Sequence, residues 1–389
     1  MGYVNDMIEK RREFLAGKIN RRQFNQALAS VGLVSTAFSL NAARNAASAQ
    51  ENDNPMVFTW SGYEEEPFVA EYVNEHGSPP QFSFFADEEE AYAKLRSGFP
   101  ADILMPCTYK VPPWYRAGLL QPIDVSRLSH WNDIVPSLQN IPGTVFDDQH
   151  YMVPEDFGFT AITFRHDLAP EYLEPENASW GFLWDTNYAG KLSMIDSLID
   201  GVAVASIYAG VNPFNLNHEE IAETKRLLQE QLPLLRYYAS SMSDVEQSMA
   251  SGELVASATW NGSRIRLKEQ GIPVTFMKPD QPALNGNPQG PMTWVCGVCL
   301  SATLNPALEQ KAYDVIDAYI SPDAGYYEVT EWAAGHANGL VYDMIDEEQL
   351  LDYGLAKNPD EVLSKGIFQE EMQQEAELQE MFEEVKAGM

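Results

Sequence analysis

Residues 55–106 read PMVFTWSGYEEEPFVAEYVNEHGSPPQFSFFADEEEAYAKLRSGFPADILMP, and this stretch decides the fold class. Three segments in it are apolar over the length of a strand: 55–60, 81–86 and 101–106. The two segments between them, 65–77 and 87–98, carry apolar residues at helical spacing and end in glycine. This order of strands and helices is typical of a parallel sheet with helices on both faces.

The alternation continues through the rest of the chain. Further strands are predicted at 191–196, 253–260 and 292–301, and an extended segment at 151–165. Further helices are predicted at 218–238, 263–271 and 305–321, and in the acidic stretch that begins near Gln369. We therefore expect an α/β protein of two lobes, in which residues 151–165 cross from one lobe to the other.

The first 49 residues have the features of an export signal. A basic stretch precedes an apolar run at 27–40, and Ala-Ser-Ala at 47–49 forms a cleavage site. The run is too short, and too rich in Ala and Ser, for a good membrane span. The arginine pair at 21–22 is the favoured twin-arginine motif, since the pair at 11–12 also matches but lies farther from the apolar run. A Sec signal and an uncleaved anchor are the alternatives. We expect export and cleavage near Ala49.

The charge of the chain restricts its partners. The formal net charge is −32, and loss of the signal, with seven basic and three acidic residues, would make it −36. Such a surface repels phosphate backbones and anionic lipid, so we expect no nucleic-acid partner. It also raises the local concentration of a cationic ligand. The sequence contains no H-E-x-x-H, G-x-S-x-G or P-loop motif, so we expect no enzyme, cofactor or metal site.

The chain has three cysteines, Cys107, Cys296 and Cys299. Three cysteines do not form the disulfide framework of a small exported protein. Cys296 and Cys299 have the spacing of a redox or metal pair, but both lie inside the predicted buried strand 292–301. We therefore expect neither a bridge nor a metal there.

Aromatic residues gather where predicted strands end. In open α/β sheets, ligands bind beyond the carboxyl ends of the strands. Four loops in this position are 60–63, 108–109, 196–200 and 260–263, and three of them carry Trp or Tyr. Trp294 lies in the following strand. We expect these rings to line a cleft.

Several stretches resemble the periplasmic spermidine/putrescine-type substrate-binding proteins of ABC transporters. They are FTWSGYEEEPFVAEYVNEHG, EEAYAKLRSGFPADILMPCTY, GLLQPIDVSRL, ATWNGS and FQEEM, in the order expected for that family. The resemblance implies a type II periplasmic binding protein fold, in which each lobe has a mixed, mostly parallel sheet flanked by helices and a hinge joins the lobes. The implied lobes are 54–158 with about 294–338, and about 159–293 with 339–389.

The resemblance also implies a ligand site between the lobes. Its members here are Trp60, Ser61, Tyr63, Tyr109, Asp196, Asp200, Trp260, Trp294 and Gln369. Aromatic faces attract an ammonium group through their quadrupole, and carboxylates fix the amine ends by charge-assisted hydrogen bonds.

The sequence departs from this family at acidic positions. Cys296 stands where a polyamine receptor commonly carries an aspartate, and other acid positions are filled by Gly62, Ser197 and Ser263. Two alternatives remain open. Either Glu155 or Asp156 supplies a charge, or the ligand has a single cationic centre, as in choline, betaine or an amino acid, whose carboxylate Arg264 would meet. Cys296 is then itself a candidate contact.

The expected function follows from the resemblance. It implies a periplasmic solute receptor, acting as a monomer, that delivers a small organic cation to the membrane permease of an ABC importer. The resemblance implies no catalysis. A secreted hydrolase or redox enzyme is the remaining alternative.

Overall fold

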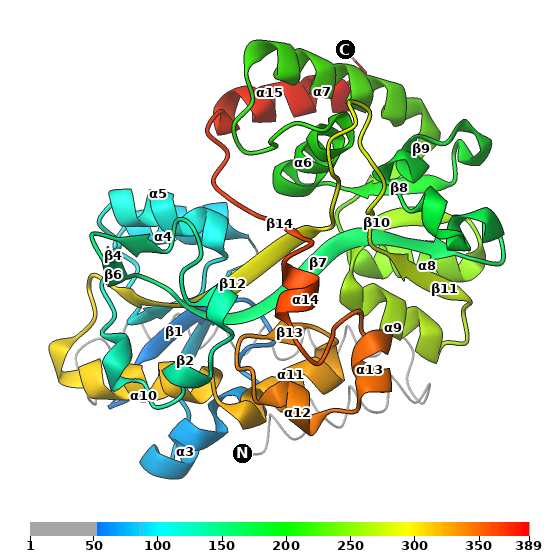
Figure 1. Ribbon diagram of the computed structural model, residues 1–389. Coiled ribbons are helices and arrows are strands. Elements are labelled where there is room, and N and C mark those ends of the chain that lie inside the picture. Colours follow the sequence, from blue (N-terminus) through cyan, green and yellow to red (C-terminus); the bar gives the residue numbers. More distant parts are fainter. Residues whose placement is uncertain (1–52, 86, 389) are drawn as a thin grey trace, which may run out of the picture. The chain divides into compact units, whose positions relative to one another are not determined.

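The computed structural model in Figure 1 describes residues 53–85 and 87–388. The predicted export signal, residues 1–49, lies outside the described residues. The chain from Asn54 onward forms one compact unit. Within it, two hydrophobic cores are joined by a pair of long strands.

The first lobe is built on the stretch that decides the fold class. Strand β1 (Met56–Thr59) pairs in parallel with β2 (Gln81–Phe84) and with β3 (Ile103–Leu104), as predicted. Strand β12 (Met292–Ser301) runs antiparallel beside β3, and β4 (Leu120–Gln121) pairs with it. The helices of this lobe are α3 (Ala70–His76), α4 (Glu88–Arg96), α5 (Val111–Arg116), α10 (Glu309–Tyr319), α11 (Pro322–Trp332), α12 (Val341–Met344), α13 (Glu347–Asp352) and α14 (Asp360–Leu363).

The second lobe repeats the same design. Strand β8 (Leu192–Ile195) pairs in parallel with β9 (Leu235–Ala239) and with β10 (Ala256–Trp260). Strand β11 (Val274–Met277) pairs antiparallel with the long strand β7 (Val153–Arg165). The helices of this lobe are α6 (Leu198–Ala209), α7 (His218–Gln231), α8 (Met242–Ser251), α9 (Asn261–Glu269) and α15 (Glu375–Lys386).

Strands β7 and β12 connect the two sheets. They pair antiparallel, and Figure 1 shows them side by side between the two lobes. Every residue of β7 except Arg165 is buried. Short strands extend this centre: β13 (Gly335–His336) pairs with β7, and β14 (Ile367–Phe368) pairs with β12. The extended crossing predicted for residues 151–165 is thereby confirmed.

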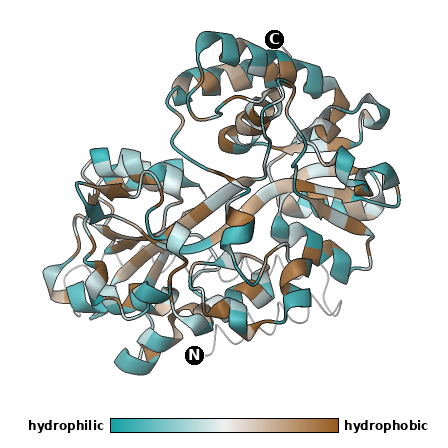
Figure 2. Ribbon diagram, in the orientation of Figure 1, coloured by the Kyte–Doolittle hydropathy of each residue, from teal (hydrophilic) through white to brown (hydrophobic). Residues whose placement is uncertain are grey.

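The two cores show where the lobes begin and end. Figure 2 shows hydrophobic residues concentrated along the strands and hydrophilic residues on outward helix surfaces. The first core includes residues from Val57 to Phe159, and again from Val295 to Leu363. The second core takes in Met372 and the apolar face of α15. A boundary drawn from the cores therefore falls between Leu363 and Met372, whereas the sequence placed it after residue 338.

Two predicted helices have different bounds in the structure: one ends earlier and the other begins later. The helix predicted at 218–238 stops at Gln231, and strand β9 follows. Pro233 cannot continue a helix, and the Arg-Tyr-Tyr run after it favours a strand. The acidic helix expected from Gln369 begins at Glu375, because the residues before it form β14 against β12.

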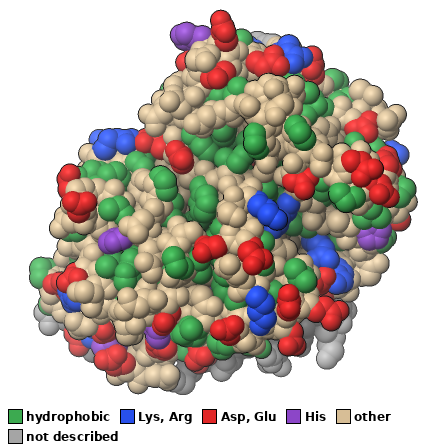
Figure 3. Space-filling model, in the orientation of Figure 1, with side chains coloured by type: hydrophobic (Ala, Val, Ile, Leu, Met, Phe, Trp, Pro, Cys, Tyr) green, Lys and Arg blue, Asp and Glu red, His purple; other side chains and the backbone are tan. Residues whose placement is uncertain are grey.

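The surface of the described residues is acidic. Figure 3 shows Asp and Glu side chains in groups scattered over the visible face and fewer Lys and Arg side chains. Among the described residues, no helix has both the length and the apolar character that a membrane span requires.

Candidate ligand-binding cleft

One face of the crossover strands carries several of the predicted site residues. Asp156 on β7 lies opposite Cys296 on β12, and Gly158 lies opposite Trp294. Directly opposite residues share a face of the sheet, as do alternate residues along a strand. A Cβ on Gly158 would lie 2.0 Å from the Trp294 ring, so the ring lies directly over this glycine. The absence of a side chain at 158 is what lets the indole lie across β7.

The second lobe adds a tryptophan and a carboxylate to this face. Trp260, at the end of β10, lies opposite Thr160 of β7 and remains 43% exposed. The Thr160 hydroxyl donates to Asp200 Oδ1 at 2.9 Å. Asp200 lies in the first turn of α6, where the helix dipole favours an anion, and it also accepts a hydrogen bond from Ser197. Burial nevertheless raises the pKa of Asp200 to about 6.

The first lobe contributes Trp60, Ser61 and Tyr63 from the turn after β1. The Tyr63 hydroxyl donates to Asp156 Oδ2 at 2.6 Å, and its ring meets Trp332 edge-on at 5.1 Å. Ser61 is exposed, and Trp60 is partly buried. The buried indole nitrogen of Trp60 has no hydrogen-bond partner. Sequence reasoning missed Trp332, whose ring is reached only through the packing of α11.

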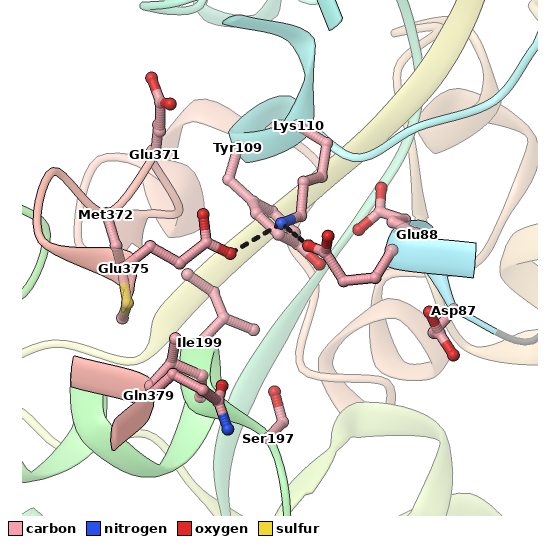
Figure 4. A pocket seen from close by; sticks show the side chains of 12 residues that line it. Asp87, Glu88, Tyr109, Lys110, Ser197, Ile199, Glu371, Met372, Glu375 and Gln379 are labelled. Atoms are coloured by element: carbon pink, nitrogen blue, oxygen red, sulfur yellow. Dashed lines mark hydrogen bonds and ion pairs between the residues drawn. The ribbon is translucent and has the colours of Figure 1, made fainter. Parts of the chain in front are cut away.

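A pocket of about 210 Å³ lies between α4 and the loop after β3 on one side and α6 and α15 on the other. Figure 4 shows Tyr109, Lys110 and Glu88 from the first lobe facing residues of the second. Lys110 Nζ lies 3.0 Å from Glu375 Oε1 and also contacts Glu89. This ion pair joins the two lobes at the rim of the pocket.

Glu88 is the principal site residue that sequence reasoning missed. Its side chain is 3% exposed, and Oε1 accepts the backbone N–H of Cys107 at 2.7 Å. Tyr109 hydrogen-bonds to the same carboxylate, while Oε2 has no partner. Burial raises the pKa of Glu88 to about 7. The pKa of Tyr109 is raised well above its ordinary value, mainly by burial and next by the charge of Glu88. The charge of Asp200 also acts on Tyr109 and raises its pKa in the same direction.

Nothing in the sequence distinguished Glu88 from its neighbours. It belongs to the run DEEE at the start of α4, which also fits a solvated helix start. Only the packing of this turn against the loop after β3 separates the buried acid from the others.

The cysteines differ from the prediction. Cys107 and Cys296 form a disulfide, and Cys299 is free and buried. Cys296 and Cys299 are three positions apart on β12, so their side chains point to opposite faces and cannot pair. Cys107 lies opposite Cys296 in an isolated bridge of the backbone. Cys296 and Cys299 are not bridged to each other, as expected, but the sequence did not predict the Cys107–Cys296 bridge, and a neutral disulfide occupies the position where the family resemblance implied an aspartate.

Several other predicted residues already have partners. Asp196 is ion-paired with Lys386 at 2.8 Å on the exposed side of its loop. Arg264 is paired with Asp352 at 2.7 Å, which removes support for a carboxylate-bearing ligand at that residue. Gln369 is 4% exposed, and its backbone oxygen accepts the Thr108 hydroxyl at 3.1 Å.

Glu155 and Asp156, the alternative acids, are sealed. Their exposed fractions are 0% and 1%, and neither lines the pocket. The Asp156 carboxylate accepts the Tyr63 hydroxyl, and the Glu155 carboxyl lies within hydrogen-bonding reach of Glu328.

The chain is similar to known transport receptors. A model of the family described as bacterial extracellular solute-binding protein matches residues 79–335. The spermidine/putrescine-binding periplasmic protein of Salmonella typhimurium is 24% identical over 88% of this chain and 94% of its own length. The putrescine/agmatine-binding protein of Pseudomonas aeruginosa is 26% identical over 85% of this chain and 88% of its own.

A solved structure shares the fold. The spermidine/putrescine substrate-binding protein PotD of Streptococcus pneumoniae superposes with a TM-score of 0.71 at 16% identity, covering 86% of this chain and 99% of that one. The two-lobed periplasmic binding protein fold expected from the sequence is thus confirmed.

Proposed function

Because the chain belongs to the bacterial extracellular solute-binding protein family, we propose that it binds a polyamine or a related small organic cation between its lobes. The names of its relatives support a polyamine, since two of them bind spermidine, putrescine or agmatine. The observation that carries the proposal is the pair of buried carboxylates, Glu88 and Asp200, whose charges both act on Tyr109.

The chemistry of the cleft suits an amine. An ammonium group offers N–H donors, and the Oε2 atom of Glu88 lacks a donor. The rings of Trp60, Tyr63, Trp260 and Trp294 would attract the cation and bury its methylene groups. Ser61 and Gln369 would complete the polar contacts. Asp196 is the weakest member of the predicted set, because its carboxylate already holds Lys386.

Glu88 offers a replacement for the missing charge, which supports a ligand with more than one amine. The disulfide at Cys296 removes one expected anion, and Glu155 and Asp156 do not line the pocket. Glu88 supplies a carboxylate in the pocket lining, and Asp200, directly after the lining residue Ile199, supplies a second one beside it. A single quaternary ammonium would leave one of them uncompensated, which is costly for a buried charge. We therefore place choline-like and zwitterionic ligands second.

Binding would favour closure of the lobes. Lys110 with Glu375, and Arg116 with Glu371, are ion pairs that join first-lobe residues to the C-terminal segment. A ligand that contacts both lobes shifts the equilibrium toward the closed state by its differential affinity for that state. The closed receptor, acting as a monomer in the periplasm, would deliver its ligand to an ABC permease without covalent chemistry.

Calorimetry on the protein without residues 1–49 tests this proposal. We expect binding of spermidine or putrescine, with weaker or undetectable binding of choline and betaine. Asp200→Asn should weaken polyamine binding by about tenfold or more, because it leaves a buried ammonium without its charge partner. The matched control is Asp244→Asn, which changes an exposed acid in the first turn of α8 and should bind as the wild type does.

Two outcomes would overturn the proposal. One is wild-type affinity in Asp200→Asn. The other is a thermal-shift screen in which only anions, metals or neutral solutes stabilise the protein, since stabilisation grows with ligand concentration above the dissociation constant.

A further inference from the structure

Three carboxyl groups meet inside the first lobe, beneath Tyr63. Glu155 and Asp156 come from β7, and Glu328 comes from α11. Their exposed fractions are 0%, 1% and 0%. Glu328 is within hydrogen-bonding reach of both other carboxyl groups. We call these three residues the acid cluster.

A β-bulge builds the acid cluster. Asp156 pairs with Cys296, but the next pair along β12 joins Gly297 to Pro154. Glu155 is therefore the extra residue on β7. Consecutive side chains of a regular strand point to opposite faces, and a bulge re-aims one of them. The bulge thus lets two successive acids approach Glu328.

Few hydrogen-bond donors reach the acid cluster, and those that do, the Tyr63 hydroxyl and backbone N–H groups at Asp156 and Cys296, all reach Asp156. Both carboxyl oxygens of Glu155, both of Glu328 and Oδ1 of Asp156 are buried without a hydrogen-bond partner outside the cluster. The side-chain donor that reaches it is the Tyr63 hydroxyl. Among the described residues, no Lys or Arg forms an ion pair with any of the three acids. Buried carboxylates in this state are costly unless a cation or protons accompany them.

The nearby histidine does not supply a ligand. Atoms of Glu155, Glu328 and His336 that are able to bind a metal lie within 4.8 Å of one another. However, His336 Nε2 lies 3.0 Å from the Tyr319 carbonyl oxygen, and Nδ1 accepts the Asn338 N–H at 3.1 Å. Both ring nitrogens are engaged, so the free donor atoms here are all oxygens.

We propose that the acid cluster binds a hard divalent cation, with calcium as the preferred ion. Calcium takes 6–8 oxygen ligands and accepts bidentate carboxylates in flexible geometry. Glu155 and Glu328 provide up to four such oxygens, and the Asp156 carboxyl lies next to Glu328. Magnesium usually keeps several waters of its own, for which this fully buried position offers little room. An oxygen-only donor set also disfavours zinc and copper, which prefer nitrogen and sulfur ligands.

The ion would act on the cleft through one contact. Asp156 accepts the Tyr63 hydroxyl with Oδ2 and directs its unpartnered Oδ1 into the cluster. A bound cation would fix Asp156 and thereby Tyr63. In the absence of the ion, protons take its place: burial raises the pKa of all three groups, and that of Asp156 to about 6.

Titration of metal-free protein with calcium alone, without any amine, tests the proposal. The acidic surface binds calcium weakly at many positions, so the comparison is between two variants of equal charge. Glu328→Gln removes a cluster ligand, and Glu331→Gln removes an exposed acid one turn later on α11. We expect one saturable calcium per chain in the wild type and in Glu331→Gln, with a rise in melting temperature. Glu328→Gln should weaken this binding by about tenfold or more, a loss seen even for outer-shell partners of metal ligands.

Three results of this titration would count against a calcium site. Equal calcium binding in both variants would mean a surface counterion effect and would overturn the proposal, as would no saturable site in the wild type. A larger response to magnesium than to calcium would overturn the choice of ion.

Terbium provides a second measurement that does not depend on the folding of a variant. This hard ion emits when excited through nearby tyrosine or tryptophan, and Tyr63 and Trp332 adjoin the cluster. We expect sensitised terbium emission from wild-type protein that calcium displaces and an equal ionic strength of sodium chloride does not. Emission that resists calcium would contradict a calcium site. Neither measurement involves an amine, so its failure would leave the proposed ligand function standing.

Discussion

The molecule buries acids in two ways. Glu88 lines the pocket and Asp200 follows the lining residue Ile199, and each accepts a hydrogen bond from the surrounding protein, from Cys107 N–H and from Thr160 respectively. The acid cluster borders no such pocket, and four of its oxygens, those of Glu155 and Glu328, find no donor outside the cluster. Buried carboxylates next to the pocket thus receive a hydrogen bond from the protein, whereas those of Glu155 and Glu328 are buried without such a donor.

This difference separates two kinds of cation. A carboxylate beside a cavity, with one oxygen satisfied and the other free, can take and release a ligand as the lobes open and close. Sealed carboxylates suit an ion or protons that stay with the folded protein. The disulfide lies between the two regions, because Cys107 donates to Glu88 and Cys296 pairs with Asp156. Substitutions at the disulfide, in the acid cluster and at the pocket should therefore have effects on stability and binding that decrease in this order.

The largest effect is expected from the disulfide. Cys107→Ala with Cys296→Ala opens a covalent loop of sequence separation 189, and should lower the free energy of unfolding by about 2–5 kcal/mol. Urea denaturation under oxidising conditions measures this loss. Cys299→Ala, which changes the free cysteine, is the control and should retain most of the stability. If the double variant unfolds at the wild-type urea concentration, the bridge does not constrain the chain.

The next effect comes from the acid cluster without calcium. Folding raises the pKa of Glu155 and Glu328 well above 4.5, so the folded protein holds protons that the unfolded chain releases. Stability is therefore lost as the pH rises above about 4.5. Glu328→Gln removes one ionisable group, and should stabilise the metal-free protein at pH 8 by about 1–4 kcal/mol.

The stabilisation by Glu328→Gln should depend on pH, which identifies unpaired buried charge as its cause. At pH 4, where all three acids are protonated in the folded protein, Glu328→Gln and the wild type should unfold at similar denaturant concentrations. Glu331→Gln should follow the wild type at both pH values. A destabilised Glu328→Gln at pH 8 in the absence of metal would contradict the account of unpaired buried charge.

Much of the fold was predictable because it depends on local patterns. The alternation of 55–106 specified β1, α3, β2, α4 and β3, and the apolar run 151–165 specified the crossing strand. The lobe boundary was not predictable in this way. Residues 341–363 form short helices whose few apolar side chains fit either lobe, and only their packing places them in the first core.

The candidate site was predictable only in part. Tryptophans at strand ends are visible as a pattern, and the register places Trp260 and Trp294 on the same face as Thr160 and Gly158. The burial of Glu88, the Cys107–Cys296 bridge and the pairing of Asp196 with Lys386 join residues far apart in the chain. No local pattern reports such contacts in a chain with so many acids. The prediction of a buried strand at 292–301 did, however, argue correctly against a Cys296–Cys299 bridge.

A smaller effect is expected in the pH dependence of polyamine binding. The pKa values of Asp200 and Glu88 are raised to about 6 and about 7 in the protein without ligand. A bound ammonium favours the ionised carboxylates and so lowers both values, which means that binding releases protons. Affinity should therefore rise by about tenfold as the pH increases from 5.5 to 7.5.

Calorimetry in buffers of different ionisation enthalpy measures the protons released. Glu88→Gln should reduce proton release near pH 7 and flatten the pH dependence. Glu347→Gln, which changes the acid at the same position of exposed helix α13, should not. Proton uptake on binding would contradict a cation beside these two acids.

The smallest effect is expected from Trp260, and it tests whether the two regions are independent. An indole that is 43% exposed attracts a cation by about 0.5–1 kcal/mol, so Trp260→Ala should weaken polyamine binding by about two- to fivefold. Tyr326→Ala removes a ring of the same exposure on α11 and should leave that affinity unchanged. Trp260 adjoins Thr160 and not the acid cluster, so the calcium response should be the same in both variants. A calcium response that changes with Trp260 would mean that the pocket and the cluster share one cation, and the distinction between them would fail.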